Sequence, residues 1–274
     1  MKYKLVALDL DGTLLDDRGE ISEKNMKAIE LSRNKGVRTI ITTGRSYVSA
    51  HKYIKLLNLP QPFIGYNGAC IYENGKPVRE ITIHDQLVPE LLKVLTDLDY
   101  APIVYPTDHL KYFQNLGSYT EDFMDFSRGF ESSLVRVDNL LERKWQNVIR
   151  ISVIASEHDT AILHSELKNR YGSMIKILQT YFAKWNFWLF EILNKQSTKS
   201  RGLEFLCKRF NISPSEVIAV GDNENDLDMI TWAGLGAAMR NSLRNVLIEA
   251  DYVTEKTNNQ SGVAEVIEKF ILGN

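Results

Sequence analysis

The sequence has no long hydrophobic run and only two cysteines, Cys70 and Cys207. None of its apolar stretches approaches the roughly 18 residues that a membrane-spanning helix needs, so we expect no membrane partner. The first apolar stretch is broken by Asp9 and Asp11, whereas a secretory signal needs a longer uninterrupted segment. The two cysteines are far apart and show no metal-binding spacing, which is typical of a reducing compartment. We therefore expect a cytoplasmic location.

The sequence also lacks an excess of either charge. Among its 274 residues, 33 are lysine or arginine and 35 are aspartate or glutamate, which gives a formal net charge of −2. This balance argues against a nucleic-acid partner, because proteins that bind nucleic acids carry a basic surface. The length suggests two domains, and no pattern indicates an oligomeric state.

Apolar segments alternate with helical patterns at both ends of the chain. The first part predicts strands at 3–10, 37–42 and 62–66 and helices at 22–36 and 46–57. The last part predicts helices at 203–210, 225–232, 243–249 and 263–271 and strands at 217–220, 235–239 and 251–253. Because alternating strands and helices are typical of parallel sheets, we expect an α/β fold with a doubly wound, Rossmann-like core.

The segment between these two parts has a different pattern. It predicts helices at 85–99 and 157–170 and strands at 147–154, 174–182 and 185–192. Only two residues separate the last two strands, which must therefore be antiparallel. We expect residues 1–83 and 193–274 to form the core and residues 84–192 to form an inserted α+β domain.

Two carboxylates, Asp9 and Asp11, follow the first predicted strand. At this spacing they can share one face of an extended chain, at the sheet edge where α/β proteins bind ligands. Two anions this close need a cation or a shared proton. With no histidine or cysteine nearby, Mg²⁺ fits better than zinc. For this pair alone, an ordinary Asp-Gly turn is an equal alternative.

Other polar segments also follow predicted strands. Thr43-Gly44 offers a hydroxyl and backbone amides to an oxyanion, although a helix N-cap is the simpler interpretation. Asn67-Gly68 favours an ordinary turn. The acidic segment 221–226 indicates metal or phosphate binding, whereas Lys199 by itself is typical of solvated surface.

Together these strand ends place carboxylates, a hydroxyl, amides and one ammonium at the same sheet edge. Since carboxylates can approach a phosphate only through a cation, the set indicates Mg²⁺ and a phosphate ester. We expect a small phosphorylated metabolite, and a sugar phosphate, a pyridoxal or flavin-pathway phosphate and a nucleotide monophosphate are equal alternatives. The sequence has no GxGxxG after a strand, no P-loop and no GxSxG, which argues against dinucleotide binding, nucleotide hydrolysis and serine-hydrolase chemistry.

The segments just described resemble a known family. Asp9–Leu15, Thr43–Arg45, Lys199 and Gly221–Asp226 resemble, in this order, the four motifs of the haloacid dehalogenase superfamily. The long insertion resembles the large α/β cap of its Cof-type phosphatases. Asn67–Ala69, Ala233-Gly234, Asn241 and Gly262–Ala264 are similar to that subfamily too.

The resemblance implies a role for each matching residue. Asp9 would be the nucleophile that forms an aspartyl-phosphate, and Asp11 would be the general acid and then the base. Mg²⁺ would be bound by Asp9, the main-chain carbonyl of Asp11 and Asp222. The phosphoryl oxygens would be held by Thr43, the amides of Leu10 and Gly44, Lys199 and Asn225, with Asp226 orienting Lys199.

The sequence departs from the family pattern at two positions that flank the site. Ser200 and Arg240 stand where glycine is frequent, which bears on substrate fit. The resemblance predicts a Mg²⁺-dependent phosphatase whose inserted domain closes over the site and excludes water. A phosphomutase with the same intermediate, a receiver-type signalling domain and a non-catalytic phospho-ligand-binding protein are the alternatives. A receiver would be far shorter than this chain.

Overall fold

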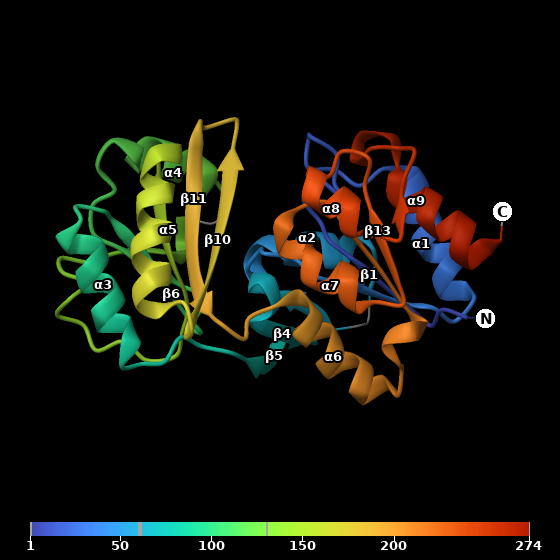
Figure 1. The fold of residues 1–274 in the computed structure, drawn as a ribbon, viewed down its shortest axis with the longest axis horizontal. Coiled ribbons are helices and arrows are strands. Elements are labelled where there is room, and N and C mark those ends of the chain that lie inside the picture. The colour runs from blue at the N-terminus through green and yellow to red at the C-terminus, as the bar shows by residue number, and fades with distance from the viewer. Residues whose placement is uncertain (1, 60–61, 130, 274) are drawn as a thin grey trace. The chain divides into compact units, whose positions relative to one another are not determined.

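The computed structural model describes residues 2–59, 62–129 and 131–273, and the chain divides into two compact units (Figure 1). Unit 1 consists of Met1–Arg79 and Thr198–Asn274, and unit 2 consists of Glu80–Ser197. No helix among the described residues has the length and the apolar character that crossing a membrane requires.

Unit 1 is built on a five-stranded parallel sheet in the order β14-β13-β12-β1-β2. The strands are β1 (Leu5–Leu8), β2 (Arg38–Ile41), β12 (Val217–Gly221), β13 (Leu235–Ala238) and β14 (Tyr252–Val253). The first and last parts of the chain meet inside this sheet, where Leu8 of β1 lies opposite Val220 of β12. The predicted parallel core is confirmed.

Helices cover both faces of this sheet. They are α1 (Glu23–Asn34), α2 (Tyr47–Leu56), α6 (Lys199–Phe210), α7 (Leu227–Trp232), α8 (Arg244–Glu249) and α9 (Gly262–Ile267). Side chains alternate along a strand, so Leu5 and Ala7 pack with Leu203 of α6 and Met229 of α7 on one face. On the other face α1 lies beside α9 (Figure 1). The sheet is therefore doubly wound.

The strand predicted at 62–66 does not extend the parallel sheet. It forms β3 (Phe63–Gly65), which joins β4 (Cys70–Glu73) and β5 (Lys76–Glu80) in a separate three-stranded sheet. A single parallel bridge between Thr42 and Ile64 connects it to the strand end of β2. Apart from that bridge, the prediction of a third parallel strand is wrong, because the turn at Asn67-Gly68 reverses the direction of the chain directly after β3.

Unit 2 contains a six-stranded sheet in the order β10-β11-β9-β6-β7-β8. The strands are β6 (Pro102–Pro106), β7 (Lys111–Phe113), β8 (Leu134–Arg136), β9 (Val148–Ala155), β10 (Ile175–Phe182) and β11 (Phe187–Asn194). The antiparallel pairing predicted for the last two is confirmed, with Phe182 opposite Phe187. The loop between them is longer than predicted, since it runs from 183 to 186. β6, β7 and β8 were not expected.

The two faces of the unit 2 sheet are covered differently. The predicted helices are confirmed as α3 (Leu87–Asp97) and α5 (Glu157–Tyr171), which bury leucines against one face. On the other face, Phe126 of α4 (Thr120–Phe126) packs against Phe182 and Phe187 at the hairpin end. Elsewhere that face carries both buried apolar side chains, such as Leu193, and the buried ion pair of Arg150 with Glu191.

Candidate active site

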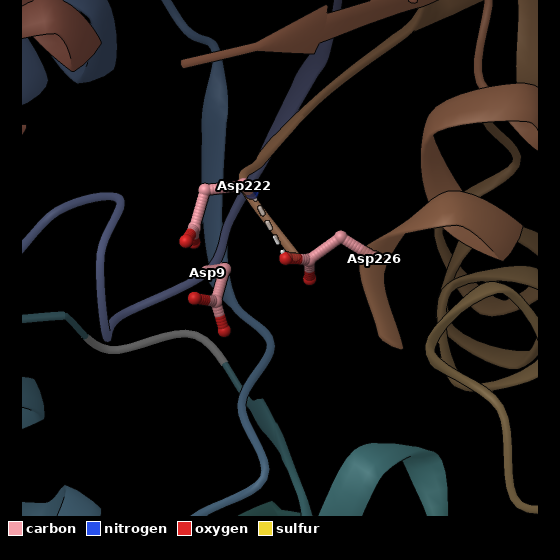
Figure 2. Close-up of side chains that lie close together, drawn as sticks. All are labelled: Asp9, Asp222 and Asp226. Atoms are coloured by element: carbon pink, nitrogen blue, oxygen red, sulfur yellow. Dashed lines mark hydrogen bonds between the residues drawn. The ribbon is translucent and has the colours of Figure 1, made fainter. Parts of the chain in front are cut away.

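Three carboxylates meet where β1 and β12 end (Figure 2). Asp9 follows β1, and its amide donates a hydrogen bond to the carbonyl of Val220 at 3.0 Å. Asp222 follows β12, and Asp226 ends the short 3₁₀ helix Glu224–Asp226. One carboxylate oxygen from each of these three aspartates lies within 4.8 Å of the others. Parallel neighbours end at the same sheet edge, which explains why segments more than 200 residues apart converge.

Lys199 lies within this cluster and is completely buried. Its ammonium donates to Asp9 Oδ1 at 2.6 Å and to Asp226 Oδ1 at 2.5 Å. It is the first residue of α6, where the Thr198 side chain caps the helix by accepting from the amide of Arg201. Burial lowers the pKa of Lys199, but Asp226 and Asp9 outweigh burial and hold it above its ordinary value. The lysine is therefore a fixed cation between two carboxylates.

Both oxygens of Asp226 are engaged. Oδ1 accepts from Lys199, and Oδ2 accepts from the amides of Asp222 and Asn223 at 3.0 Å each. One carboxylate thus ties the lysine to the loop that carries Asp222. Although Asp226 belongs to the acidic cluster, its hydrogen bonds hold Lys199 and the Asp222 loop in place.

Asp9 and Asp222 differ from Asp226 because each retains an oxygen that accepts no hydrogen bond from the described residues. Thr13 Oγ1 donates to Asp222 Oδ1 at 2.8 Å and Lys199 donates to Asp9 Oδ1, so the Oδ2 atom of each carboxylate remains without such a bond. Burial and the neighbouring Asp226 raise the pKa of Asp222 to about 7. Burial likewise holds the pKa of Asp9 well above its ordinary value, although Lys199 opposes the shift. A buried and a half-buried carboxylate with available oxygens are a donor set that suits a hard divalent cation.

The Asp11 side chain lies away from this cluster and pairs with Arg45. Arg45 Nε and a terminal nitrogen donate to its two oxygens at 2.8 and 2.6 Å. The Asp11 side chain is 56% exposed, unlike the buried Asp9. We expected the Thr43–Arg45 motif but assigned no role to Arg45. An oxygen that accepts from arginine cannot at the same time give a proton to a leaving group.

The predicted phosphate-binding groups lie on the neighbouring strand ends. Thr43 is buried, and its hydroxyl accepts from the amide of Arg45 at 3.1 Å. The amides of Leu10 and Gly44 donate no hydrogen bond to any described residue, so both can serve an anion. The Thr43 hydroxyl and the two amides belong to the turns after β1 and β2, which end at the same edge of the sheet.

Asn67 contacts the site, although its sequence favours an ordinary turn. It lies in the 3₁₀ turn Tyr66–Gly68 with a φ of 53°, and it is buried. Asn225 Nδ2 donates to Asn67 Oδ1 at 2.8 Å, and the Asn67 amide donates to the carbonyl of Thr43. Its contact with the site could have been predicted from its position, because Asn67 closely follows an apolar strand, as the predicted site segments do.

Gly12 allows the Asp9–Thr13 turn to approach Asp222. Its φ is +77°, and a Cβ added there would lie 2.4 Å from Asp222 Oδ2. Asn241 Nδ2 donates to the Gly12 carbonyl at 2.8 Å and fixes the turn from the other half of the chain. Only glycine fits both the backbone conformation and this contact.

The two departures from the family pattern have partners of their own. The Ser200 amide and hydroxyl both donate to Asp228 Oδ2, at 3.0 and 2.8 Å. The Arg240 guanidinium donates to the carbonyl of Glu255 at 3.1 Å. Ser200 therefore links the start of α6, next to Lys199, to α7.

Comparison with known proteins agrees with this geometry. A family model described as haloacid dehalogenase-like hydrolase matches residues 6–267 of the chain. The Bacillus subtilis protein 5-amino-6-(5-phospho-D-ribitylamino)uracil phosphatase YitU is 28% identical over 269 residues, covering 98% of this chain and 98% of that protein.

Solved structures show the same similarity. TM0651 from Thermotoga maritima is 30% identical, with a TM-score of 0.82 over 98% of this chain and 97% of that one. A haloacid dehalogenase-like hydrolase from Bacteroides thetaiotaomicron is 26% identical, with a TM-score of 0.82 over 98% of this chain and 99% of that one.

Proposed function

The chain belongs to the haloacid dehalogenase-like hydrolase family, and on that premise we propose that it is a Mg²⁺-dependent phosphomonoester hydrolase that works through an aspartyl-phosphate on Asp9. The family match and the names of the relatives support a phosphatase. One observation carries the detailed proposal. Lys199 donates to one oxygen of Asp9 and Thr13 donates to one oxygen of Asp222, so each of these aspartates keeps a second oxygen that can bind a cation.

Mg²⁺ would be held by Asp9, Asp222 and the main-chain carbonyl of Asp11. The raised pKa values of Asp9 and Asp222 fit this assignment, because burial raises both pKa values by more than the charge of Lys199 lowers them, and a bound cation would offset the difference. When bound, the ion supplies the charge that lets a phosphate dianion approach these carboxylates. Asp226 would position Lys199 and the Asp222 loop, since both of its oxygens are engaged.

In the first step, a carboxylate oxygen of Asp9 attacks phosphorus and the bond from phosphorus to the leaving oxygen breaks. Asp11 gives that oxygen a proton, for which its carboxyl must first leave Arg45. Lys199 orients Asp9 and balances its charge, so the carboxylate needs little reorganisation during attack. Thr43, Asn225 and the amides of Leu10 and Gly44 hold the other phosphoryl oxygens.

In the second step, water attacks the phosphorus of the aspartyl-phosphate. Asp11 takes the proton of the water, the bond between phosphorus and the Asp9 oxygen breaks, and inorganic phosphate leaves. The two steps return both aspartates to their starting states. Catalysis by positioning and charge neutralisation is what phosphoryl transfer requires.

The substrate class we propose is a small phosphorylated metabolite. YitU carries in its name a ribitylaminouracil phosphate, a phosphate ester of a polyhydroxy chain, which supports esters of this kind. We assign unit 2 the role of a cap that selects among them, because a site made only at a sheet edge would be open to water.

The test is phosphate release from p-nitrophenyl phosphate and from a panel of sugar and polyol phosphates. We expect turnover with Mg²⁺, none with a chelator, and recovery when Mg²⁺ is restored. Asp222→Asn should require far more Mg²⁺, whereas Asp97→Asn on the exposed surface of α3 should behave as the unmodified protein. Full activity in chelator would contradict the metal site.

Two alternatives give different products in the same assay. A phosphomutase would convert a sugar phosphate into its isomer with little release of inorganic phosphate. A non-catalytic binding protein would bind the esters with neither turnover nor a phosphoryl adduct on the chain. Intact-mass measurement after rapid quenching distinguishes that outcome from slow hydrolysis.

A further inference from the structure

The loop between β13 and α8 lies against the turn that carries Asp222. This loop comprises residues 239–243, and we call it the β13–α8 loop. Its Met239 amide donates to the carbonyl of Gly221 at 3.1 Å. Its Leu243 amide donates to the carbonyl of Asp222 at 3.0 Å. Because β13 is the parallel neighbour of β12, both segments follow strands that end at the same sheet edge, and the loop holds the peptide groups on both sides of Asp222.

The same loop reaches the turn that carries Asp11. Asn241 Nδ2 donates to the carbonyl of Gly12 at 2.8 Å, and Asn241 Oδ1 accepts from the amide of Asn258 at 2.9 Å. Both ends of the side-chain amide are therefore engaged, which favours a single orientation of Asn241. Since Gly12 directly follows Asp11, the first of these hydrogen bonds restrains the peptide group next to the main-chain carbonyl that we assign to Mg²⁺.

The β13–α8 loop is attached to buried residues on its other side. Asn258 is 6% exposed, and its Nδ2 donates to the carbonyl of Leu15 at 3.0 Å. The Arg240 amide donates to Thr254 Oγ1 at 2.9 Å, and Thr254 is buried as well. Because its own partners are fixed, the loop can resist movement of the two turns that it joins.

The two turns also contact each other directly, through the Asp222 side chain. Thr13 Oγ1 donates to Asp222 Oδ1, and a Cβ added to Gly12 would lie 2.4 Å from Asp222 Oδ2. This contact depends on a side chain, which can rotate. The hydrogen bonds from the β13–α8 loop restrain the backbone of both turns instead, so they fix the spacing between the Asp11 carbonyl and Asp222.

The spacing and the rigidity of oxygen ligands decide which divalent cation a site prefers. Mg²⁺ requires nearly octahedral ligands at about 2.0–2.1 Å, whereas Ca²⁺ accepts about six to eight oxygens at about 2.3–2.6 Å in a flexible geometry. A rigid set of ligands can therefore favour the smaller ion, and a set that can widen loses that preference. Neighbours that orient metal ligands typically change metal affinity by about 10- to 100-fold.

We propose that Asn241 is a positioning residue that sets the spacing between the Asp11 carbonyl and Asp222, and thereby makes the site prefer Mg²⁺ to Ca²⁺. This inference rests on the proposed function, from which it takes the cation and its ligands. Asn241 contacts neither the cation nor the substrate, because it acts through Gly12. The backbone of the β13–α8 loop supplies the fixed support from which Asn241 acts.

Calorimetric titration with Mg²⁺ and with Ca²⁺ measures this preference without any turnover. The unmodified protein should bind Mg²⁺ more tightly. Asn241→Ala should weaken Mg²⁺ binding about 10-fold or more and Ca²⁺ binding less than about 3-fold, so the ratio of the two dissociation constants should change. Asn241→Asp keeps an acceptor for the Asn258 amide but loses the donor to Gly12. Its added charge acts on both cations, so this variant should lose the preference too.

Variants at Asn245 are the matched control. Asn245 lies on an exposed position of α8, and Asn245→Ala and Asn245→Asp make the same chemical changes there. Both should leave the two dissociation constants within about 2-fold of the unmodified values at physiological ionic strength. Asp222→Asn should weaken the binding of both cations, which places them at this site. Thermal unfolding in chelator should give midpoints within about 4 °C for the Asn241 variants, because only hydrogen bonds of an exposed side chain are lost.

The outcomes separate this proposal from the proposed function. A selective loss of Mg²⁺ binding in both Asn241 variants, with no phosphate release by the unmodified protein, supports the positioning role and contradicts the hydrolase. Mg²⁺-dependent turnover with an unchanged ratio of dissociation constants in these variants, or with an equal loss for both cations, overturns the positioning role and leaves the hydrolase standing. Equal affinity of the unmodified protein for the two cations, or cation binding that Asp222→Asn leaves unchanged, also overturns it.

Discussion

The two units position charged side chains in different ways. Unit 1 gathers Asp9, Lys199 and Asp222 at the ends of parallel strands and helices, from loops that lie far apart in the sequence. Unit 2 places Arg150 and Glu191 in the middle of antiparallel strands, where they share a face through register. A parallel sheet collects functional groups at an edge, whereas an antiparallel sheet presents them on a face.

The two arrangements also differ in how they balance charge. In unit 1, one buried lysine faces Asp9 and Asp226, and Asp222 adds a third carboxylate nearby. In unit 2, a buried arginine faces a single carboxylate. The excess of negative charge in unit 1 favours a cation, whereas the ion pair in unit 2 is balanced. Four predictions test this contrast.

The largest expected effect follows from changing the two leading aspartates. Asp9→Asn should lower kcat on the order of 10⁴-fold or more, because an amide is a poor nucleophile. Asp11→Asn keeps the nucleophile but should slow steps that need proton transfer by about 10²–10⁴-fold. With p-nitrophenyl phosphate, whose leaving group needs little protonation, it should release about one equivalent of nitrophenolate and then stall.

Rapid-quench kinetics and intact-mass analysis measure this pair of variants. The Asp11→Asn protein should carry one added phosphoryl group, and the Asp9→Asn protein should carry none. Measurable turnover in Asp9→Asn, together with the absence of both burst and adduct in Asp11→Asn, would mean that the nucleophile is assigned to the wrong residue.

The second prediction compares the two buried cations. Lys199→Met leaves Asp9 and Asp226 without their shared partner and should lower the free energy of unfolding by about 3–5 kcal/mol. Arg150→Met leaves only Glu191, which can accept a proton, so the loss should be smaller. Urea unfolding with a chelator measures both losses. As a control, Lys93→Met removes an exposed pair with Asp97 on α3 and should change stability by less than about 0.5 kcal/mol. An equal loss for both variants would contradict the contrast.

The third prediction concerns pH in the absence of metal. Burial and Asp226 raise the pKa of Asp222 to about 7, against an ordinary value of 3.8. Between these values the folded protein retains a proton that the unfolded chain has lost, so the free energy of unfolding should fall as pH rises. We expect a fall on the order of 2 kcal/mol between pH 4 and pH 7.

Mg²⁺ should oppose this fall, because a cation favours the ionised carboxylates. The ion should therefore stabilise the protein more at pH 8 than at pH 5, as measured by urea unfolding with Mg²⁺ or with chelator. The variant Asp222→Asn should flatten the profile in chelator. A stabilisation by Mg²⁺ that is identical at both pH values would argue against binding at these carboxylates.

The smallest expected effect compares two glycines with similar backbones. Gly12 and Gly36 have φ values of +77° and +84°, but an added Cβ would meet Asp222 only at Gly12, and nothing lies within 4 Å at Gly36. Both alanine variants should lose about 1 kcal/mol from backbone strain. Gly12→Ala should also weaken Mg²⁺ binding and lower kcat/KM, whereas Gly36→Ala should leave both unchanged. Thermal unfolding and Mg²⁺ titration provide the comparison.

The residues that follow the apolar strands of the parallel sheet were predictable from the sequence. Asp9 and Asp222 stand directly after such strands, and a doubly wound sheet brings those ends together. The helix predicted at 22–36 is confirmed as α1, and the Ser22 hydroxyl caps it by accepting from the amide of Asn25. The signals are local, because they depend on composition and on the residue that ends each element.

Short strands and partners across the fold were not predictable in this way. β7 and β8 have three residues each, too few to show an alternating pattern, and Pro102 and Pro106 weaken the signal of β6. Asn67 resembles an ordinary turn until its contact with Asn225 is seen. Likewise, the pairing of Arg45 with Asp11 depends on where two separate turns lie.

The sequence by itself determined the parallel core, the order of the strand-end motifs and the types of group available for chemistry. Only the tertiary structure decided which oxygens are engaged, so that Asp226 anchors Lys199 while Asp9 and Asp222 keep an oxygen each. It also decided that Arg150 and Glu191 pair across neighbouring strands of unit 2. The physical reason is that residue types and local periodicity are written along the chain, whereas register and hydrogen-bond partners depend on strands that are distant in sequence.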